Sequence, residues 1–317
     1  MQSRQDFKTY YDTTLLPLLT SLDRERKSLI NKVFLFAFIG IAGGVAGAML
    51  IGVPGFFLTI IVAGVIFALL YGGKFKVVKE RFKKEIIAHM VTSIDASLVY
   101  EHNRFIPQSE YNKSKLFLSN INRYKGDDFV QGTVGKTAIR FSELLTQLET
   151  RRVNNGKTQT SVTTIFRGIF FIADFNKKFV GETFVVPDNA EKLLGSFGTI
   201  FQKMTVGRPP LVKLEDIAFE KEFCVYGTDQ VEARYILSTA LMQRIMEFKN
   251  RFNTDIFISF VDSQIFIAIS VWKNLFEAPL LRSMINYKRM TEYHQYLSLC
   301  IGIVEVLDLN TRIWTKE

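Results

Sequence analysis

The chain has 317 residues, of which 48% are hydrophobic and 13% aromatic, and its formal net charge is +9. This composition excludes a largely disordered chain, because disordered chains lack the apolar residues that a core requires. Cys224 and Cys300 lie far apart and form no C-x-x-C pair, which gives no disulfide framework or cysteine-based metal site and fits a reducing compartment.

Residues 1–32 are predicted to form a first stalk helix. Apolar side chains recur there at helical spacing: Tyr11, Leu15, Leu18, Leu22 and Leu29. Pro17 interrupts the pattern and is expected to kink or restart the helix, because proline removes a helical hydrogen bond.

Residues 33–73 contain no charged side chain at all. One membrane-spanning helix needs about 20 apolar residues, so this block predicts a transmembrane helical hairpin of two spans, 33–51 and 56–71. Gly52, Pro54 and Gly55 lie in its middle and favour a turn. A block that starts after 32 residues and contains a second span is not expected to be a signal peptide.

The net positive charge lies beside this apolar block. Residues 22–32 carry a net charge of +2 and residues 74–84 carry +5. By the positive-inside rule both ends of the hairpin face the cytoplasm, which predicts a multi-pass protein of the bacterial inner membrane with both termini cytoplasmic. The small remaining charge argues against a nucleic-acid partner.

The first span contains glycines that are spaced four apart, namely Gly40 with Gly44 and Gly43 with Gly47. Small residues at this spacing let helix backbones approach closely. The sequence leaves open whether this face packs against the second span or against another copy of the chain. Neither span contains an ionisable residue, which disfavours a conducting pore.

Residues 74–104 are predicted to form a second stalk helix that runs back beside the first. Phe75, Val78, Phe82, Ile86 and Met90 recur at intervals of three or four residues. We expect this apolar stripe to form the core of the stalk.

Residues 105–317 are predicted to form a cytoplasmic α+β domain with a mostly antiparallel sheet flanked by helices. Strands are expected within residues 127–144, 163–175 and 182–187, and a β-hairpin around Asp262–Ser263. Helices are expected over 216–223, 230–251 and 275–299. Residues 151–161 read as a loop or hairpin tip, and the Gly/Pro-punctuated residues 189–211 read as a long mobile connection.

Several short motifs have ordinary structural explanations. Gly135-Lys136-Thr137 ends like a phosphate-binding loop, but Val130 stands where that motif requires glycine, so a β-hairpin turn is expected. Adjacent acids at Asp127–Asp128 and Glu215–Asp216 could bind metal or act as acid and base, but such pairs more often mark turns and helix starts. His89, His102 and His294 are scattered along the chain.

The stretch VYGTDQVEARYIL (225–237) concentrates charged side chains at Asp229, Glu232 and Arg234. Asp229 is predicted to cap a helix with Glu232 three residues later, close to a capping box. Arg234 is then expected to join a buried network with a carboxylate, and Ser238 and Thr239 could start a second helix. The alternative is a ligand or partner site at the same three residues.

The same region carries a family resemblance. The stretch LVKLEDIAFEKEFCVYGTDQVEARYILS (211–238) resembles a signature of a domain of unknown function found in bacterial membrane proteins, often encoded near LemA-type proteins. Residues 166–188, ISFVDSQIFIAIS, residues 302–314 and the two-span hairpin match as well. The resemblance implies a membrane anchor and a cytoplasmic-facing domain, but no reaction and no catalytic residues.

These observations favour a membrane-anchored binding or assembly module without evident catalytic chemistry. Its expected partners are the lipid bilayer and either further copies of the chain or another membrane protein, such as a LemA-type protein; no cofactor is predicted. One alternative is a ligand- or nucleotide-responsive enzyme domain whose site is assembled from distant residues. Another is an oligomeric membrane conduit.

Overall fold

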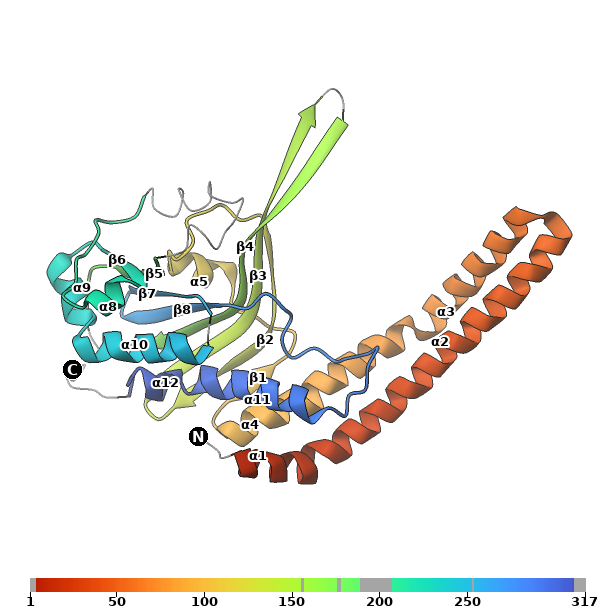
Figure 1. The fold of residues 1–317 in the computed structure, drawn as a ribbon, viewed down its shortest axis with the longest axis horizontal. Coiled ribbons are helices and arrows are strands. Elements are labelled where there is room, and N and C mark those ends of the chain that lie inside the picture. Colours follow the sequence, from red (N-terminus) through yellow and green to blue (C-terminus); the bar gives the residue numbers. More distant parts are fainter. Residues whose placement is uncertain (1–3, 155–156, 176–177, 189–206, 253, 311–317) are drawn as a thin grey trace. The chain divides into compact units, whose positions relative to one another are not determined.

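The structure is a computed structural model that describes residues 4–154, 157–175, 178–188, 207–252 and 254–310. The chain divides into two compact units (Figure 1). The first comprises Met1–Met90 and Phe276–Gln295, and the second comprises Val91–Leu275 and Tyr296–Glu317.

Two long helical stretches make up most of the first unit. The first stretch consists of α1 (Arg4–Tyr10), a π-helical turn (Tyr11–Leu15) and α2 (Leu16–Ile51). The second consists of α3 (Val53–Phe82), a π-helical turn (Lys83–Ile87) and α4 (Ala88–Ile94). Pro17 lies in the first turn of α2, directly after the π-helical turn. The backbone stays helical through this turn, so the helix changes its hydrogen-bond pattern before the proline but does not restart.

A single residue makes the turn between α2 and α3. Gly52 has φ 72°, a backbone conformation that glycine adopts without steric cost. Pro54 lies in the first turn of α3, and the Gly55 amide donates to the Gly52 carbonyl at 2.9 Å. The predicted turn is therefore present but shorter than expected, because Pro54 and Gly55 belong to the helix.

The second helical stretch ends at Ile94 rather than at residue 104 as predicted for the stalk. The Asp95 carboxylate accepts the Ser97 amide at 2.9 Å, and the Leu98 amide returns to the Asp95 carbonyl at 3.2 Å. This turn competes with the helix and leads into strand β1 (Val99–Glu101), which sequence patterning had missed.

The second unit is built on an eight-stranded sheet with the order β1-β2-β3-β4-β8-β7-β5-β6. All neighbouring strands are antiparallel, which confirms the predicted α+β class and mostly antiparallel sheet. The strands are β2 (Arg123–Val134), β3 (Thr137–Asn154), β4 (Lys157–Asp174), β5 (Thr183–Pro187), β6 (Phe223–Gly227), β7 (Ile256–Val261) and β8 (Gln264–Ser270).

Tight turns connect the hairpins where the sequence predicted them. Gly135, with φ 63°, lies in the turn between β2 and β3, which confirms a hairpin in place of a phosphate-binding loop. Asp262 and Ser263 have φ 50° and 56° and connect β7 to β8, as hairpin turns with two positive φ values do. Residues 151–161, expected to be a loop or hairpin tip, belong mostly to β3 and β4, and residues 155–156 between these strands lie outside the described residues.

Helices cover both faces of the sheet, and α5 (Gln108–Lys113) and α10 (Thr239–Phe252) lie on opposite sides of it (Figure 1). On the α5 side, Tyr111 packs against Phe170 with ring centroids 5.1 Å apart. In β4 the side chains of Ile169 and Phe170 are both buried, although they point to opposite faces. Burial on both faces explains why the central strands are almost continuously apolar.

The helices that follow β5 in the chain differ in detail from the prediction. The helix expected over 216–223 is only α8 (Ile217–Glu220), because β6 begins at Phe223. The stretch 230–251 forms two helices, α9 (Gln230–Ile236) and α10, which separate at Ser238 as predicted. Most of the connection 189–211 lies outside the described residues.

The long helix expected over 275–299 is also shorter. Residues 275–286 are irregular, α11 (Tyr287–Ile301) follows them, and α12 (Ile303–Val306) comes after Gly302. Pro279 disfavours helix before it, and the Asn286 side chain accepts the Arg289 amide at 2.9 Å and so marks a new start.

Candidate functional site

Asp229 is a helix cap, as its position in the sequence predicted. Its Oδ1 accepts the amides of Val231 at 2.8 Å and Glu232 at 2.9 Å, at the first turn of α9. The backbone of Asp229 itself is extended, with φ −128° and ψ 120°, as in other N-cap residues. Its carboxylate is therefore used by the helix it begins.

Glu232 does not close the predicted capping box but binds a distant loop. Its two carboxylate oxygens accept the amides of Val180 at 2.8 Å and Gly181 at 2.6 Å. A Cβ at Gly181 would lie 2.5 Å from Glu232 Oε2, so a side chain there would displace the carboxylate. Nearby, Thr228 Oγ1 accepts the Glu182 amide at 2.8 Å. The α9 start thus fixes the loop that leads into β5.

Arg234 lies on the surface, and the prediction that it joins a buried network with a carboxylate is wrong. Its Nε donates to the Lys213 carbonyl at 3.2 Å, and its Nη1 donates to the Gln230 carbonyl at 3.2 Å. Arg234 is exposed, as is Asp229. The three residues lie close together in the sequence, but their side chains form hydrogen bonds to three different groups of backbone atoms.

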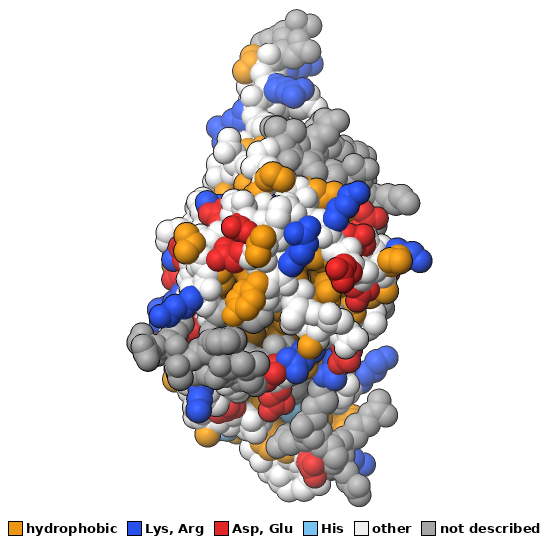
Figure 2. All heavy atoms as spheres, turned by 90° about the vertical axis from the view of Figure 1, so that its left-hand side faces the viewer, with side chains coloured by type: hydrophobic (Ala, Val, Ile, Leu, Met, Phe, Trp, Pro, Cys, Tyr) orange, Lys and Arg blue, Asp and Glu red, His pale blue; other side chains and the backbone are white. Residues whose placement is uncertain are grey.

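Exposed apolar side chains lie on α8, on α9 and in the segment before α8. They are Leu211, Ile217, Val231 and Tyr235. Figure 2 shows the face that carries α8 and α9, where hydrophobic, acidic and basic side chains alternate without a continuous patch of one kind. The ligand or partner site predicted at Asp229, Glu232 and Arg234 therefore remains a prediction.

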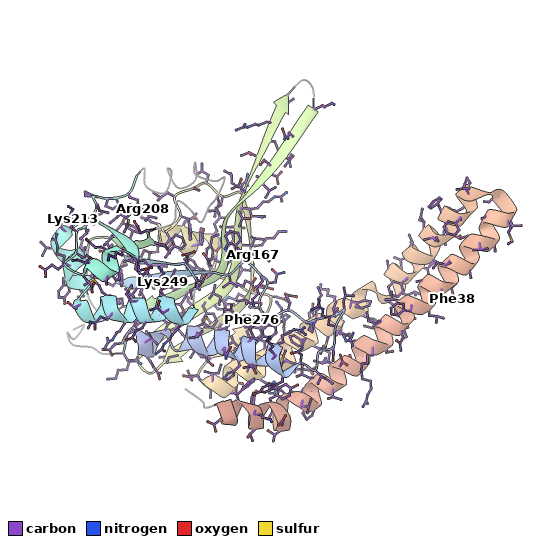
Figure 3. The ribbon with its side chains drawn as sticks, in the orientation of Figure 1. Phe38, Arg167, Arg208, Lys213, Lys249 and Phe276 are labelled. Atoms are coloured by element: carbon purple, nitrogen blue, oxygen red, sulfur yellow. The ribbon has the colours of Figure 1, made fainter. Side chains whose placement is uncertain are left out.

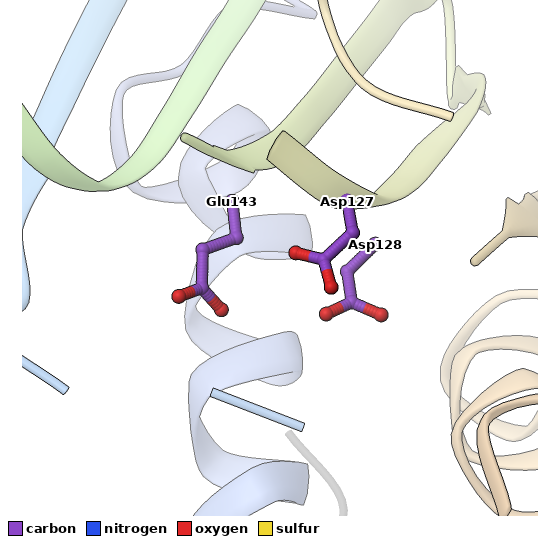
Figure 4. Close-up of side chains that lie close together, drawn as sticks. All are labelled: Asp127, Asp128 and Glu143. Atoms are coloured by element: carbon purple, nitrogen blue, oxygen red, sulfur yellow. The ribbon is translucent and has the colours of Figure 1, made fainter. Parts of the chain in front are cut away.

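The sequence identified only two members, Asp127 and Asp128, of a second group of carboxylates. Oxygens of Asp127, Asp128 and Glu143 all lie within 4.8 Å of one another (Figure 4). Asp127 pairs across the ladder with Glu143, next to an irregularity in the β2–β3 register. Asp128 has φ 57°, which turns the chain locally and brings its side chain to the same place.

This acidic cluster is buried and engaged by the fold. Asp128 is 2% exposed and Glu143 is 8% exposed. The Tyr100 hydroxyl donates to Asp128, and the Leu275 amide donates to Glu143 at 2.9 Å. Carboxylate oxygens are the ligands that Mg²⁺, Ca²⁺ and Mn²⁺ prefer, so this is the group in the described residues with the donor set for a hard cation.

The cluster could have been found by counting from the hairpin turn. Val134 pairs with Thr137 beside Gly135, so strict pairing places Asp128 opposite Glu143. The pairing actually shifts by one residue at the bulge and brings Asp127 opposite Glu143. The sequence signal for the cluster was therefore a pair of adjacent acids that hairpin pairing places opposite a third acid on a buried strand.

A pocket of about 390 Å³ lies along the same strands. Ile139 and Ile172 are among its apolar side chains, and its polar ones are Ser97, Gln131, Thr133, Arg140, Asp174 and Gln264. Arg140 is already paired with Glu110 at 2.8 Å. The pocket is open and its charges are partly compensated, so it is a weaker candidate than the acidic cluster.

Three of the four predicted packing glycines lie against α3 of the same chain. A Cβ at Gly40 would lie 3.3 Å from Ala63 Cβ, one at Gly44 would lie 2.8 Å from the Phe56 ring, and one at Gly47 would lie 2.7 Å from the Gly55 carbonyl oxygen. Gly43 has no atom within 4 Å of such a Cβ. The glycines at 40, 44 and 47 thus permit close approach within the hairpin.

Replacing Gly47 by Leu is expected to separate α2 from α3, because the new side chain would meet the Gly55 backbone. The measurement is disulfide cross-linking between Gly40→Cys and Ala63→Cys in membranes, in a background that lacks Cys224 and Cys300. We expect the yield to fall several-fold. Gly43→Leu adds the same bulk to open space and should leave the yield unchanged; an equal loss in both variants would contradict this packing.

A comparison with known protein families gives a match over the region that contains α9. Residues 164–309 match the model of a family described as "Protein of unknown function (DUF3137)". The match includes Asp229, Glu232 and Arg234, whereas the acidic cluster and the helical hairpin precede it. No curated protein matches the chain.

One solved structure is similar at a low level. It is the crystal structure of the mycobacterial trehalose monomycolate transport factor A, TtfA, with a TM-score of 0.33 and 7% sequence identity. The similarity covers 70% of this chain and 96% of that chain. At this TM-score the likeness supports no conclusion about fold or function.

Proposed function

We propose that the chain is a membrane-anchored binding or assembly module of the bacterial inner membrane, with a cytoplasmic head formed by the α+β unit. The observation that supports this most directly is a change in burial along α2 and α3. Leu19, Leu22 and Phe82 are fully buried inside the first unit. Beyond them, between residues 33 and 73, the same helices expose large apolar side chains such as Phe38, labelled in Figure 3, and Leu69.

Lipid is the environment that suits this exposed surface. The stretches Asp6–Ile51 and Val53–Ile94 are long and apolar enough to cross a membrane. Only 11% and 6% of their most apolar windows are buried, whereas a core helix of a soluble protein would be mostly buried. Water would be an unfavourable solvent for a contiguous apolar surface of this length.

The orientation follows from charge. Lys32 and Lys74 are the first charged residues on either side of the apolar block, and further basic residues follow both. Loops with an excess of Lys and Arg stay on the cytoplasmic side, so we place both termini and the sheet there. The turn at Gly52 would then face the other side of the membrane.

A binding or assembly role suits the polar chemistry of the head. Asp229 and Glu232 hold backbone amides of α9 and of the loop before β5, and Asp128 and Glu143 hold Tyr100 and the Leu275 amide. These carboxylates build the scaffold. The expected partners are further copies of the chain or another membrane protein, among which a LemA-type protein is a candidate by family resemblance.

Topology labelling tests the anchor. In a background without Cys224 and Cys300, Val53→Cys should react with a membrane-impermeant maleimide from outside intact spheroplasts. Val153→Cys, on the exposed end of β3, should react only after permeabilisation. Alkaline carbonate should leave the chain in the membrane. Release by carbonate, or a protected Val53→Cys together with an accessible Val153→Cys, would contradict the proposal.

Gentle detergent extraction tests the assembly part. We expect the tagged chain, purified from native membranes, to elute as a homo-oligomer or together with another membrane protein. A strictly monomeric particle with no co-purifying protein would contradict it while leaving the membrane anchor intact.

A further inference from the structure

The first charged residues on either side of the apolar block lie at the same level of the hairpin. Lys32 precedes Gly52 on α2 and Lys74 follows it on α3. At 1.5 Å per residue both lie about 30 Å from the turn, which is the thickness of the hydrocarbon core of a bilayer. A membrane spanned by this hairpin therefore places both ammonium groups at one lipid–water interface.

Both lysines converge on one aromatic ring. Lys32 Nζ lies 5.2 Å from the centroid of the Tyr71 ring, and Lys74 Nζ lies 5.1 Å from it. Both distances lie within the range of cation–π attraction, so the same ring attracts both ammonium groups. Tyrosine is also the residue type that is enriched at the lipid headgroup level.

The Tyr71 ring is itself held in place by neighbours from both helices. It stacks on Phe67 of α3 at 5.2 Å and meets Phe36 of α2 edge-on at 5.7 Å between ring centroids. Aromatic rings packed in this way have little rotational freedom. The platform for the two ammonium groups is therefore preorganised.

Nearby carboxylates form ion pairs with other basic side chains. Asp23 pairs with Arg26 and Lys27, Glu25 and Glu85 pair with Arg81, and Glu80 pairs with Lys76. Within the part of the chain that the structure describes, no ion pair includes Lys32 or Lys74. Each ammonium group can donate up to three hydrogen bonds, and a ring face occupies only one side of it.

We propose that Lys32, Tyr71 and Lys74 form a headgroup site for an anionic phospholipid. The two ammonium groups donate to the phosphodiester oxygens, and the Tyr71 hydroxyl supplies a further donor at the same level. Two adjacent positive charges favour a lipid with net negative charge over a zwitterionic lipid, whose own cationic group would be repelled. This inference rests on the proposed membrane insertion and assigns that anchor a lipid preference.

The test measures lipid selectivity in vesicles. The full chain is reconstituted in phosphatidylcholine vesicles that contain a trace of spin-labelled phosphatidylglycerol or spin-labelled phosphatidylcholine, and the motionally restricted fraction of each lipid is compared. Three proteins are used: the wild type, the double variant Lys32→Gln/Lys74→Gln, and the control Lys76→Gln/Lys79→Gln. The control removes the same charge from neighbouring positions of α3.

The wild type and the control are expected to prefer the phosphatidylglycerol probe by at least about fivefold, and the Lys32→Gln/Lys74→Gln variant is expected to lose this preference. Tyr71→Leu should weaken it as well, because the shared ring is lost. Equal selectivity in all variants, or none in the wild type, would overturn the site. Flotation of each protein with its vesicles is measured in parallel; a wild type that floats but shows no selectivity overturns only this site, whereas one that does not float overturns the anchor too.

Discussion

Replacing Asp23 by Ala is expected to lower the free energy of unfolding of the first unit by about 3–5 kcal/mol. Asp23 is only 1% exposed and accepts Arg26 Nε at 2.8 Å and the Met284 amide at 2.9 Å. Arg26 is 7% exposed and also donates to the Leu280 carbonyl at 3.2 Å. Without Asp23 a buried guanidinium loses its carboxylate, and the segment at 280–284 loses its attachment to α2.

Chemical unfolding of the detergent-solubilised chain checks this expectation. Glu25→Ala is the matched control, because Glu25 lies on the same helix and pairs with Arg81 on the surface. Exposed pairs contribute about 0–1 kcal/mol, so the control should change little. Equal effects of the two substitutions would show that the Asp23 network does not hold the unit together.

The same residue predicts a pH dependence. Burial raises the pKa of Asp23, but hydrogen bonds from Arg26, Met284 and Lys27 more than offset it and hold the pKa below its usual value. A carboxyl group whose pKa is lower in the folded state contributes stability above its unfolded pKa, and loses it as the pH falls through the folded pKa. The difference in stability between wild type and Asp23→Ala should therefore shrink below about pH 4.

Replacing Gly168 by Ala is expected to destabilise the sheet unit by about 4 kcal/mol or more. Gly168 lies in the central strand β4 with φ 149°, a conformation that other residues rarely adopt. A Cβ there would lie 2.0 Å from the Ile269 carbonyl oxygen and 2.7 Å from the Val271 nitrogen. Since both atoms belong to the backbone beside β4, the strands would have to separate.

The measurement is the yield of folded full-length chain together with its unfolding midpoint. Gly72→Ala serves as the control, because a Cβ at Gly72 meets no atom within 4 Å. An unfolding curve for Gly168→Ala that overlays the wild type would mean that β4 and β8 can move apart at little cost.

Local signals in the sequence predicted several features correctly. The charge-free block and Gly52 predicted the helical hairpin, and Asp262–Ser263 predicted the turn between β7 and β8. Asp229 was identified as a helix cap from its position alone. In each case the deciding interaction joins residues close in the chain, such as the hydrogen bonds from Val231 and Glu232 to Asp229.

Other features depend on residues far apart in the sequence and were missed or wrong. Glu232 binds amides about fifty positions earlier, at Val180 and Gly181, so the expected capping box did not form. The acidic cluster joins two strands, and Glu143 is brought to Asp127 and Asp128 by the β2–β3 pairing, so the adjacent acids by themselves did not reveal it. The strand β1 is only three residues long, too short for a periodic pattern.

The sequence by itself determined the apolar hairpin, its flanking charge and the α+β class, because hydropathy, charge and hydrophobic periodicity act over one helix or one strand. Only the tertiary structure decided the partners of the other polar side chains discussed above. It brought Arg234 to carbonyl groups instead of a carboxylate, and it brought Lys32 and Lys74 to one tyrosine ring. The physical reason is that partners of buried and interfacial polar groups are set by register and helix packing, which join distant parts of the chain.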